Sequence, residues 1–367
     1  MKIKRLSLWH VPLTSKTTYY MAEGKSCDTV ETVVLCLETD TGVSGWGETC
    51  PIPHYLPAYA RGIAPALEEL APVILGADPV GPEALMAKAD AYLIGHAYAK
   101  SALDIALWDL TAKVAGLPLA ALLGGQRRKT LPLYHSITCI APEDMAEIAK
   151  EAQISGITQF QVKLGADANN EADIARLRLV REAVGAGPLV YGDWNCGATS
   201  LDAIRVGRAV ADHDIMLEQP CETIEHCARV KAATGLAMKL DENANDTASL
   251  LEGHRLGVMD AVALKLSKFG GISKMRAARD LCYHLGVKMC VEDTWGSDIS
   301  TAALAHLAAA TDPRYVLNAC DLSGYVSPHL AKDGPRRQNG TLTVPEGIGL
   351  GITPDLDILG PADLILE

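Results

Sequence analysis

Four segments in the second half of the chain repeat one pattern: "LVYGDWN" (189–195), "IMLEQP" (215–220), "AMKLDEN" (237–243) and "VALKLSKFGG" (262–271). Each holds a short apolar run, typical of a buried strand, that leads into a charged residue: Asp193, Glu218, Asp241 or Lys265. These residues are 25, 23 and 24 positions apart, which leaves room for one short strand and one helix. The repeat therefore predicts a sheet built from successive strand–helix units.

The same rhythm extends on both sides of these segments. Strand candidates lie near 133–138, 159–164, 189–193, 215–218, 238–241, 262–265, 288–293 and 316–321. Most helical patterns between them stop at a glycine just before the next strand, at Gly156, Gly185, Gly235, Gly257 and Gly286. About eight such units predict a (β/α)8-type barrel. A doubly wound open sheet is the alternative, but "ITCIAPEDM" (137–145) lacks the glycine-rich phosphate-binding pattern that would favour it.

The first third of the chain has a different organisation. "TVETVVLCLETDTGVSGWGETC" (29–50) contains two β-rich runs around Thr41 and Gly42, which predicts a hairpin. Apolar residues recur at helical spacing from Tyr98 to Ala115, and Gly116 ends that run. Strands followed by helices indicate an α+β unit ahead of the barrel.

Composition excludes several classes of partner. The chain has 367 residues, 49% of them apolar, and a formal net charge of −12, which disfavours nucleic acid or anionic membranes as partners. "MKIKRLSLWHVPL" (1–13) lacks the apolar run of a signal peptide, and no stretch is long enough to span a membrane. The ten cysteines form no C-x-x-C pair. We therefore expect a cytoplasmic protein with reduced thiols and no zinc site.

Three carboxylates follow successive strands of the predicted barrel. Asp193, Glu218 and Asp241 would meet at the carboxyl end of the barrel, where barrel active sites lie. Their negative charges would repel one another unless a cation lay between them. Hard oxygen ligands suit Mg²⁺, which keeps positions open for substrate oxygens. The pattern therefore predicts a magnesium site.

Two lysines lie on opposite sides of this predicted site. Lys163, in "ITQFQVKLGAD" (157–167), ends the second strand, and Lys265 ends the sixth. Mg²⁺ bound to a substrate carboxylate acidifies the α-proton, because it stabilises the enediolate that forms. The two lysines could then act as base and acid on opposite faces of the α-carbon. We expect burial and the nearby cation to lower their pKa.

Each of these residues also has a simpler explanation when it is taken alone. A single acid at a strand end is usually a helix cap, and a single lysine in a loop is usually solvated. Three acids and two lysines at one-unit spacing, all at the same end of their strands, favour the functional interpretation.

Motifs along nearly the whole chain resemble the enolase superfamily, specifically its muconate-lactonizing (cycloisomerase) subgroup. They are "GVSGWGET" (42–49), the helix within 99–125, "GDWN" (192–195), "LEQP" (217–220), "LDE" (240–242), "KLSKFGGI" (265–272), "EDTWGSDI" (292–299) and "PEGIGLGI" (345–352). The resemblance implies a modified (β/α)7β barrel at 129–340, an α+β capping domain at 1–128, and a C-terminal tail at 341–367 that returns to the capping domain.

The resemblance also implies roles for single residues. Asp193, Glu218 and Asp241 would bind Mg²⁺, and Lys163 and Lys265 would be the acid/base pair. Capping-domain loops near 14–24 and 50–60 would close over the substrate. The mandelate-racemase-like subgroup, which uses a His–Asp dyad, is disfavoured because a lysine occupies the strand-six position.

One motif departs from the usual family pattern. Where Lys-x-Lys is usual on the second strand, this chain has Gln161-Val162-Lys163, which replaces a cation with a neutral amide. The change removes repulsion towards a substrate that is cationic near its α-carbon. The pattern resembles racemases and 2-epimerases of proline betaine and hydroxyproline betaine, and cis-3-hydroxyproline dehydratases. That resemblance implies that Tyr55, Gln161, Asp293 and Trp295 line the substrate pocket.

The last strand departs from the betaine epimerases. They carry a tryptophan there that can face a quaternary ammonium, whereas this chain has Cys320 and Asp321 in "LNACDLSGYV" (317–326). Asp321 could pair with a protonated ring nitrogen, as in the dehydratases, or it could cap the following segment.

These observations favour a Mg²⁺-dependent enzyme that removes the α-proton of a carboxylate substrate, acting as racemase or 2-epimerase of a proline-type amino acid or betaine. A cis-3-hydroxyproline dehydratase is the first alternative, and a dipeptide epimerase or cycloisomerase the next. A Schiff-base aldolase and a non-catalytic metabolite-binding barrel stay open. Barrels of the resembling family commonly form oligomers, so we expect a homo-oligomer.

Overall fold

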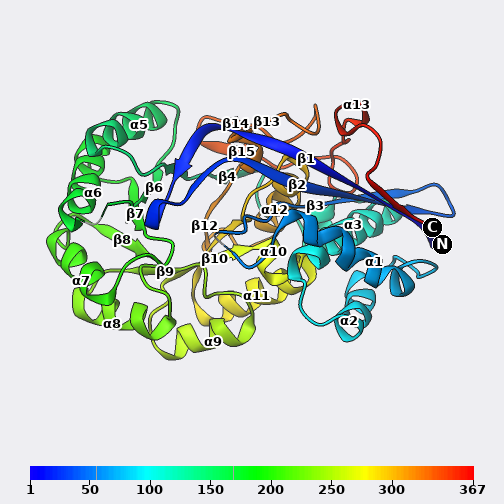
Figure 1. Ribbon diagram of the computed structural model, residues 1–367, viewed down its shortest axis with the longest axis horizontal. Helices are drawn as coiled ribbons and strands as arrows, with labels where there is room; N and C mark the ends of the chain where they lie inside the picture. Colours follow the sequence, from blue (N-terminus) through cyan, green and yellow to red (C-terminus); the bar gives the residue numbers. More distant parts are fainter. Residues whose placement is uncertain (55, 168) are drawn as a thin grey trace.

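A parallel eight-stranded barrel forms the centre of the computed structural model, which describes residues 1–54, 56–167 and 169–367 (Figure 1). Its strands pair strictly in sequence order: β5 (His135–Ile137), β6 (Gln159–Lys163), β7 (Leu189–Asp193), β8 (Ile215–Glu218), β9 (Met238–Leu240), β10 (Ala261–Lys265), β11 (Lys288–Glu292) and β12 (Val316–Ala319). The two ends of this sheet meet at a parallel bridge between Leu133 and Ala319. The predicted barrel is confirmed, and the doubly wound alternative, whose strand order reverses, is wrong.

Helices connect the strands on the outside of the barrel. They are α5 (Pro142–Ile154), α6 (Asn170–Val184), α7 (Ser200–Ala209), α8 (Ile224–Thr234), α9 (Thr247–Arg255), the short α10 (Leu266–Phe269), α11 (Ile272–Leu285) and α12 (Asp298–Ala309). A 3₁₀ turn, η3 (Leu322–Gly324), follows β12 in place of an eighth helix, as the (β/α)7β prediction requires. Gly235 and Gly286 end α8 and α11 at positive φ, a conformation that glycine adopts without strain.

The N-terminal third forms an antiparallel sheet covered by helices. The sheet contains β1 (Ile3–Tyr20), β2 (Ser26–Thr39) and β3 (Ser44–Thr49), and the helices are α1 (Ile63–Ile74), α2 (Pro82–Tyr92) and α3 (Ala97–Ala115). The predicted hairpin and the predicted helix near 98–115 are therefore confirmed. Shorter elements are η1 (Ala22–Gly24), η2 (Ala60–Gly62), α4 (Leu119–Leu122), β4 (Thr130–Pro132), β13 (Val326–Ser327), β14 (Arg337–Gln338), β15 (Thr341–Thr343), α13 (Leu356–Leu359) and β16 (Leu364–Leu366).

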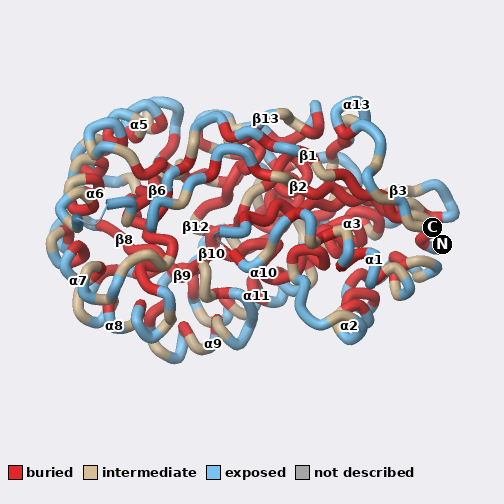
Figure 2. The backbone as a smooth tube through the Cα atoms, viewed as in Figure 1, coloured by how far each residue is buried: buried red, intermediate tan, exposed pale blue. Residues whose placement is uncertain are grey.

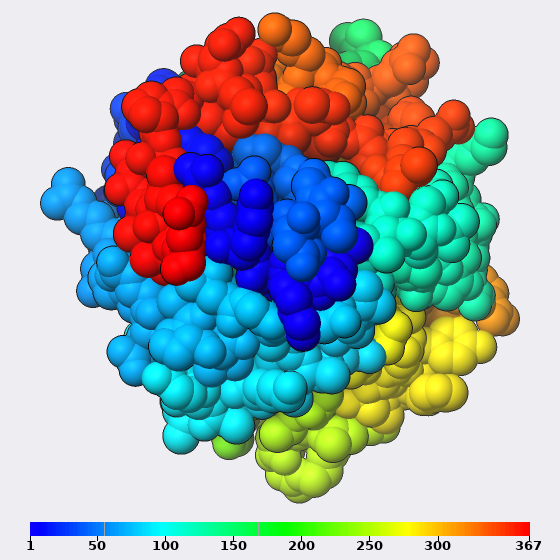
Figure 3. Space-filling model, turned by 90° about the vertical axis from the view of Figure 1, so that its right-hand side faces the viewer, coloured from blue at the N-terminus to red at the C-terminus, as the bar shows by residue number. Residues whose placement is uncertain are grey.

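The C-terminal tail completes the capping sheet. β16 pairs with β1 through Leu6–Leu366 and Leu8–Leu364, and Figure 3 shows the tail packed against the N-terminal strand. β13 also pairs with β1, although it lies within the range assigned to the barrel. The boundaries at residues 128 and 340 stay predictions.

Two buried apolar clusters hold the molecule together. One runs from the barrel interior into β1 and β2, and the other joins those strands to α1, α2 and α3. Figure 2 shows the buried backbone concentrated where the capping sheet meets the barrel. Among the helices of the described residues, none is long and apolar enough to cross a membrane.

A buried carboxylate of the capping domain contacts the start of a barrel helix. Glu48 on β3 accepts hydrogen bonds from the backbone N–H groups of Ser297 and Ser300, at 2.7 and 2.8 Å. The hydroxyl groups of Ser297 and Thr32 also donate to it, at 2.9 and 2.7 Å. The first N–H groups of a helix lack partners within the helix, so Glu48 caps α12 from the other domain.

Replacing Glu48 with glutamine is expected to lower the free energy of unfolding by about 2 kcal/mol, because an amide NH₂ cannot accept from these buried donors. The midpoint of urea denaturation followed by circular dichroism measures the change. Glu68→Gln, at an exposed position on α1, is the matched control and should leave the midpoint unchanged. Equal midpoints for the two variants would show that Glu48 does not hold the domains together.

Candidate active site

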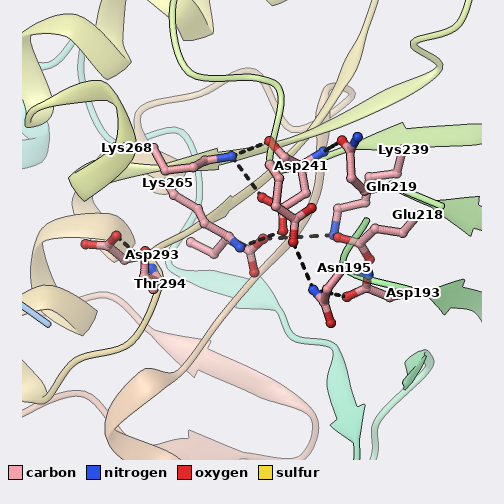
Figure 4. Close-up of polar contacts among 12 residues, drawn as sticks. Asp193, Asn195, Glu218, Gln219, Lys239, Asp241, Lys265, Lys268, Asp293 and Thr294 are labelled. Atoms are coloured by element: carbon pink, nitrogen blue, oxygen red, sulfur yellow. Dashed lines mark hydrogen bonds and ion pairs between the residues drawn. The ribbon is translucent and has the colours of Figure 1, made fainter. Parts of the chain in front are cut away.

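The five residues predicted to carry the chemistry lie together at the carboxyl end of the barrel. Lys163, Asp193, Glu218 and Lys265 are the last residues of their strands, and Asp241 directly follows β9. Lys163 pairs in register with Asp193, and Asp193 with Glu218, so their side chains leave adjacent strands at one level. Figure 4 shows the three carboxylates grouped, with Lys265 beside Asp241.

Each predicted catalytic lysine contacts a predicted metal ligand. Lys163 Nζ lies 2.5 Å from Asp193 Oδ2, and Lys265 Nζ lies 2.6 Å from Asp241 Oδ2. Lys268 on α10, to which sequence analysis assigned no role, donates to Asp241 Oδ1 at 2.8 Å. The five side chains that form these contacts are all buried, so their charges interact strongly.

Glu218 is paired with a lysine that sequence analysis missed. Lys239 is the register partner of Glu218 on β9, and its Nζ lies 2.8 Å from Glu218 Oε1. Both side chains are 0% exposed. The sequence did contain a sign that Lys239 belongs to the site. It stands two residues before Asp241, and residues i and i+2 of a strand face the same side.

Gln161 bridges two of the predicted metal ligands. Its amide nitrogen donates to Asp193 Oδ2 at 3.1 Å and to Glu218 Oε2 at 2.8 Å. Its amide oxygen accepts from the Ser136 hydroxyl at 2.7 Å, which fixes the orientation of the amide. Carboxylate oxygens from two strands therefore lie within reach of one nitrogen atom.

Burial and the neighbouring carboxylates act in opposite directions on the lysine pKa, and the lowering expected beside a bound cation stays a prediction. Burial by itself lowers the pKa of Lys163, but the charges of Asp193 and Glu218 outweigh burial and raise it above the usual value. Burial likewise acts to lower the pKa of Lys265, and Asp241 is the main charge that instead holds this pKa well above its usual value.

The donor chemistry of the three carboxylates fits Mg²⁺. Asp193 and Glu218 are 0% exposed and Asp241 is 1% exposed, and all three supply hard oxygen atoms from adjacent strands. Across the residues that the structure describes, no three acidic, histidine or cysteine side chains converge at metal-binding distance. Lysine ammonium groups contact each carboxylate instead, which shows that the cluster favours positive charge.

One cavity joins the lysines to the capping domain. Lys163, Gln161, Lys265, Asp293 and Trp295 all line it, as predicted for substrate or catalytic contacts. The other lining residues are Tyr19, Met21, Ile52, Tyr134, Ser136, Glu292, Thr294, Cys320, Leu322 and Tyr325. Because Tyr19, Met21 and Ile52 belong to the segments 14–24 and 50–60, the capping domain supplies part of the wall. The cavity has a volume of about 60 Å³.

Of the predicted substrate contacts, Asp321 lies away from the cavity lining and Tyr55 cannot be assigned a position. Asp321 is not among the described residues that line the cavity, and its two oxygens accept from Arg337 Nε at 2.8 Å and Nη2 at 2.5 Å. Its side chain makes no cap hydrogen bond to η3 either. Tyr55 lies outside the described residues. The buried Nε1 of Trp295 has no hydrogen-bond partner among them, which leaves a donor beside the cavity.

Comparison with known proteins assigns both parts of the chain to related enzyme families. Residues 8–124 match the mandelate racemase/muconate lactonizing enzyme N-terminal domain family, and residues 144–358 match the enolase C-terminal domain-like family. The two matches together cover most of the chain. The first match lies within the capping domain, and the second covers most of the barrel and part of the C-terminal tail.

Individual relatives span the whole chain. A cis-3-hydroxy-L-proline dehydratase from Roseibium aggregatum is 40% identical over 98% of each chain, and a hydrophobic dipeptide epimerase from Enterococcus faecalis is 29% identical over 96% of this chain and 100% of its own. A putative mandelate racemase/muconate lactonizing enzyme from Roseovarius nubinhibens, solved with magnesium, superposes with a TM-score of 0.94 at 32% identity over 100% of both chains. This chain therefore belongs to the mandelate racemase/muconate lactonizing enzyme family of the enolase superfamily.

Proposed function

We propose that this protein is a Mg²⁺-dependent dehydratase of a proline-type amino acid with a 3-hydroxyl group, such as cis-3-hydroxyproline. The observation that carries the proposal is the placement of Lys163 and Lys265 in one cavity, four strands apart around the barrel, with the three carboxylates on the strands between them. A substrate carboxylate directed towards those three strands would leave its α-carbon between the two lysines.

The side chains of the site can accept and supply the protons that dehydration requires. A lysine amine takes the proton of the α-carbon, and the electron pair left behind forms a double bond to the β-carbon. The carbon–oxygen bond at the β-carbon breaks, and a lysine ammonium supplies the proton that lets the hydroxyl leave as water. The enamine product then tautomerises to the cyclic imine, pyrroline-2-carboxylate.

Asp193, Glu218 and Asp241 would hold the Mg²⁺ ion. When bound, the ion would supply positive charge that stabilises a substrate carboxylate as its α-carbon loses a proton. Gln161 keeps two ligand carboxylates in place through its amide nitrogen. Because this amide is neutral, it does not repel the ammonium of an amino acid substrate.

Dehydration now ranks above epimerisation, which sequence analysis had placed first. The dehydratase from Roseibium aggregatum is 40% identical over nearly the full length, whereas the epimerases and cycloisomerases among the relatives are 27% to 30% identical. Epimerisation of a proline-type substrate is the second candidate, because two lysines in one cavity can also exchange a proton between opposite faces. A homo-oligomer in the cytoplasm stays a prediction.

Incubation with Mg²⁺ and cis-3-hydroxy-L-proline is expected to yield pyrroline-2-carboxylate, which o-aminobenzaldehyde detects. trans-4-Hydroxy-L-proline is the matched control substrate and should lose no water, because its hydroxyl group is not on the β-carbon. Nuclear magnetic resonance in D₂O follows exchange of the α-proton of either compound. Deuterium incorporation with inversion and without water loss would support the epimerase instead. Turnover of dipeptides alone would overturn both candidates.

A further inference from the structure

The cavity wall contains two neighbouring acids at the end of β11, and one of them is already engaged. Asp293 accepts hydrogen bonds from the backbone N–H and hydroxyl groups of Ser267, at 3.0 and 2.8 Å. It also accepts from the backbone N–H of Thr294 at 2.7 Å. Both oxygens of Asp293 therefore bind protein donors, and its carboxylate fixes the start of α10.

Glu292 keeps an oxygen available. Its Oε2 atom accepts a hydrogen bond from the Tyr134 hydroxyl, whereas its Oε1 atom lies 4.0 Å from Lys239 Nζ, beyond hydrogen-bond distance. Within the described part of the chain, Glu292 Oε1 has this one long ion-pair contact and no hydrogen bond. The side chain lines the cavity although the residue is only 2% exposed, so its carboxylate is largely shielded from water.

The surroundings of Glu292 hold it in place. Lys239 Nζ lies over the rings of Tyr191 and Tyr134, 4.8 and 5.5 Å from their centroids, which fixes the ammonium between two aromatic side chains. Its closer ion-pair partner is Glu218, at 2.8 Å. Removing the charge of Glu292 therefore leaves Lys239 paired, so a variant at this position should still fold.

Glu292 also lies beside the lysine expected to act on the substrate. Lys265 and Glu292 are register partners on β10 and β11, about 4.8 Å apart in the sheet. In a proline-type amino acid the ring nitrogen is bonded directly to the α-carbon, at about 1.5 Å. A group beside the lysine that takes the α-proton is therefore also close to that nitrogen.

We propose that Glu292 binds the ring ammonium of the substrate through Oε1, and that it selects an amino acid over a neutral carboxylic acid of the same shape. Tyr134 and Lys239 act as positioning residues that orient the carboxylate. The inference rests on the proposed function in that it takes the substrate to be a cyclic amino acid. It goes further by naming the residue that binds the ring nitrogen.

Isothermal titration with two unreactive ligands tests this assignment without turnover. L-Proline carries the ammonium, and tetrahydrofuran-2-carboxylate has an uncharged oxygen in its place. With Mg²⁺ present, the wild-type protein is expected to bind L-proline at least about tenfold more tightly, as for one hydrogen bond to a charged group. Glu292→Gln should reduce that preference to less than about threefold. Thermal melting confirms that the variant is folded.

Asp293→Asn is the matched variant, because it removes the neighbouring acid of the same cavity wall. It should keep the wild-type preference ratio even if it weakens binding of both ligands. Loss of the ratio in Asp293→Asn with retention in Glu292→Gln would overturn the assignment, as would a wild type that binds both ligands equally. If the ratio depends on Glu292 but cis-3-hydroxy-L-proline is not dehydrated, only the proposed function fails.

Discussion

Replacing Lys265 with alanine is expected to lower kcat for dehydration by about 10³-fold, within the range typical of a lost general acid or base. Lys163→Ala should have an effect of similar size, because both lysines line one cavity from strands four apart around the barrel. Neither variant removes a carboxylate of the proposed metal site. Product formation and α-proton exchange in D₂O, measured separately for each enantiomer, are the readouts. Each variant should retain exchange for at most one enantiomer, since one lysine remains.

The matched control for both variants is Lys288→Ala. Lys288 is exposed and begins β11, at the opposite end of a barrel strand from the site, where it donates to the backbone oxygen of Arg314 at 3.0 Å. Its loss should leave kcat within about twofold of wild type, as expected for a surface substitution. Near-normal turnover by folded Lys163→Ala and Lys265→Ala proteins would show that these lysines do not carry the proton transfer, whereas binding without turnover by the wild type would support a barrel that only binds metabolites.

Chelation of divalent cations is expected to lower turnover by at least about 10³-fold, and added Mg²⁺ should restore it. The reason is that an α-proton next to a carboxylate is too weakly acidic for a lysine amine unless positive charge stabilises the product of its removal. Asp241→Asn should weaken Mg²⁺ binding about 10-fold or more, because one of three anionic ligands is lost. Isothermal titration with MgCl₂ measures that affinity, independently of turnover.

Asp212→Asn is the control for the metal-site variant, because this aspartate is exposed and forms its ion pair with the neighbouring His213, away from the proposed metal ligands. It should leave the Mg²⁺ affinity unchanged. Full activity in EDTA would contradict the metal-dependent mechanism. If borohydride then also trapped substrate on a lysine, the Schiff-base aldolase considered from the sequence would be the better explanation.

The sequence predicted the barrel and the candidate catalytic and metal-binding residues because both depend on short-range patterns. One apolar run per 23 to 25 residues, ending in Asp193, Glu218, Asp241 or Lys265, shows both the strand and the end at which its polar residue lies. Successive parallel strands present these ends at one face of the sheet. The predicted residues therefore meet in the structure, although the segments that carry them are distant in the chain.

Contacts between those residues were decided only by the closed barrel. Lys239 and Glu292 lie on strands that are not adjacent, and they share the interior only because the sheet curls into a barrel. Arg337, sixteen residues along the chain from Asp321, binds that carboxylate and withdraws it from the cavity. Local patterns give the position of a charge along its own strand. Which charges meet, and which oxygen of Glu292 stays available, depends on long-range packing that one strand does not encode.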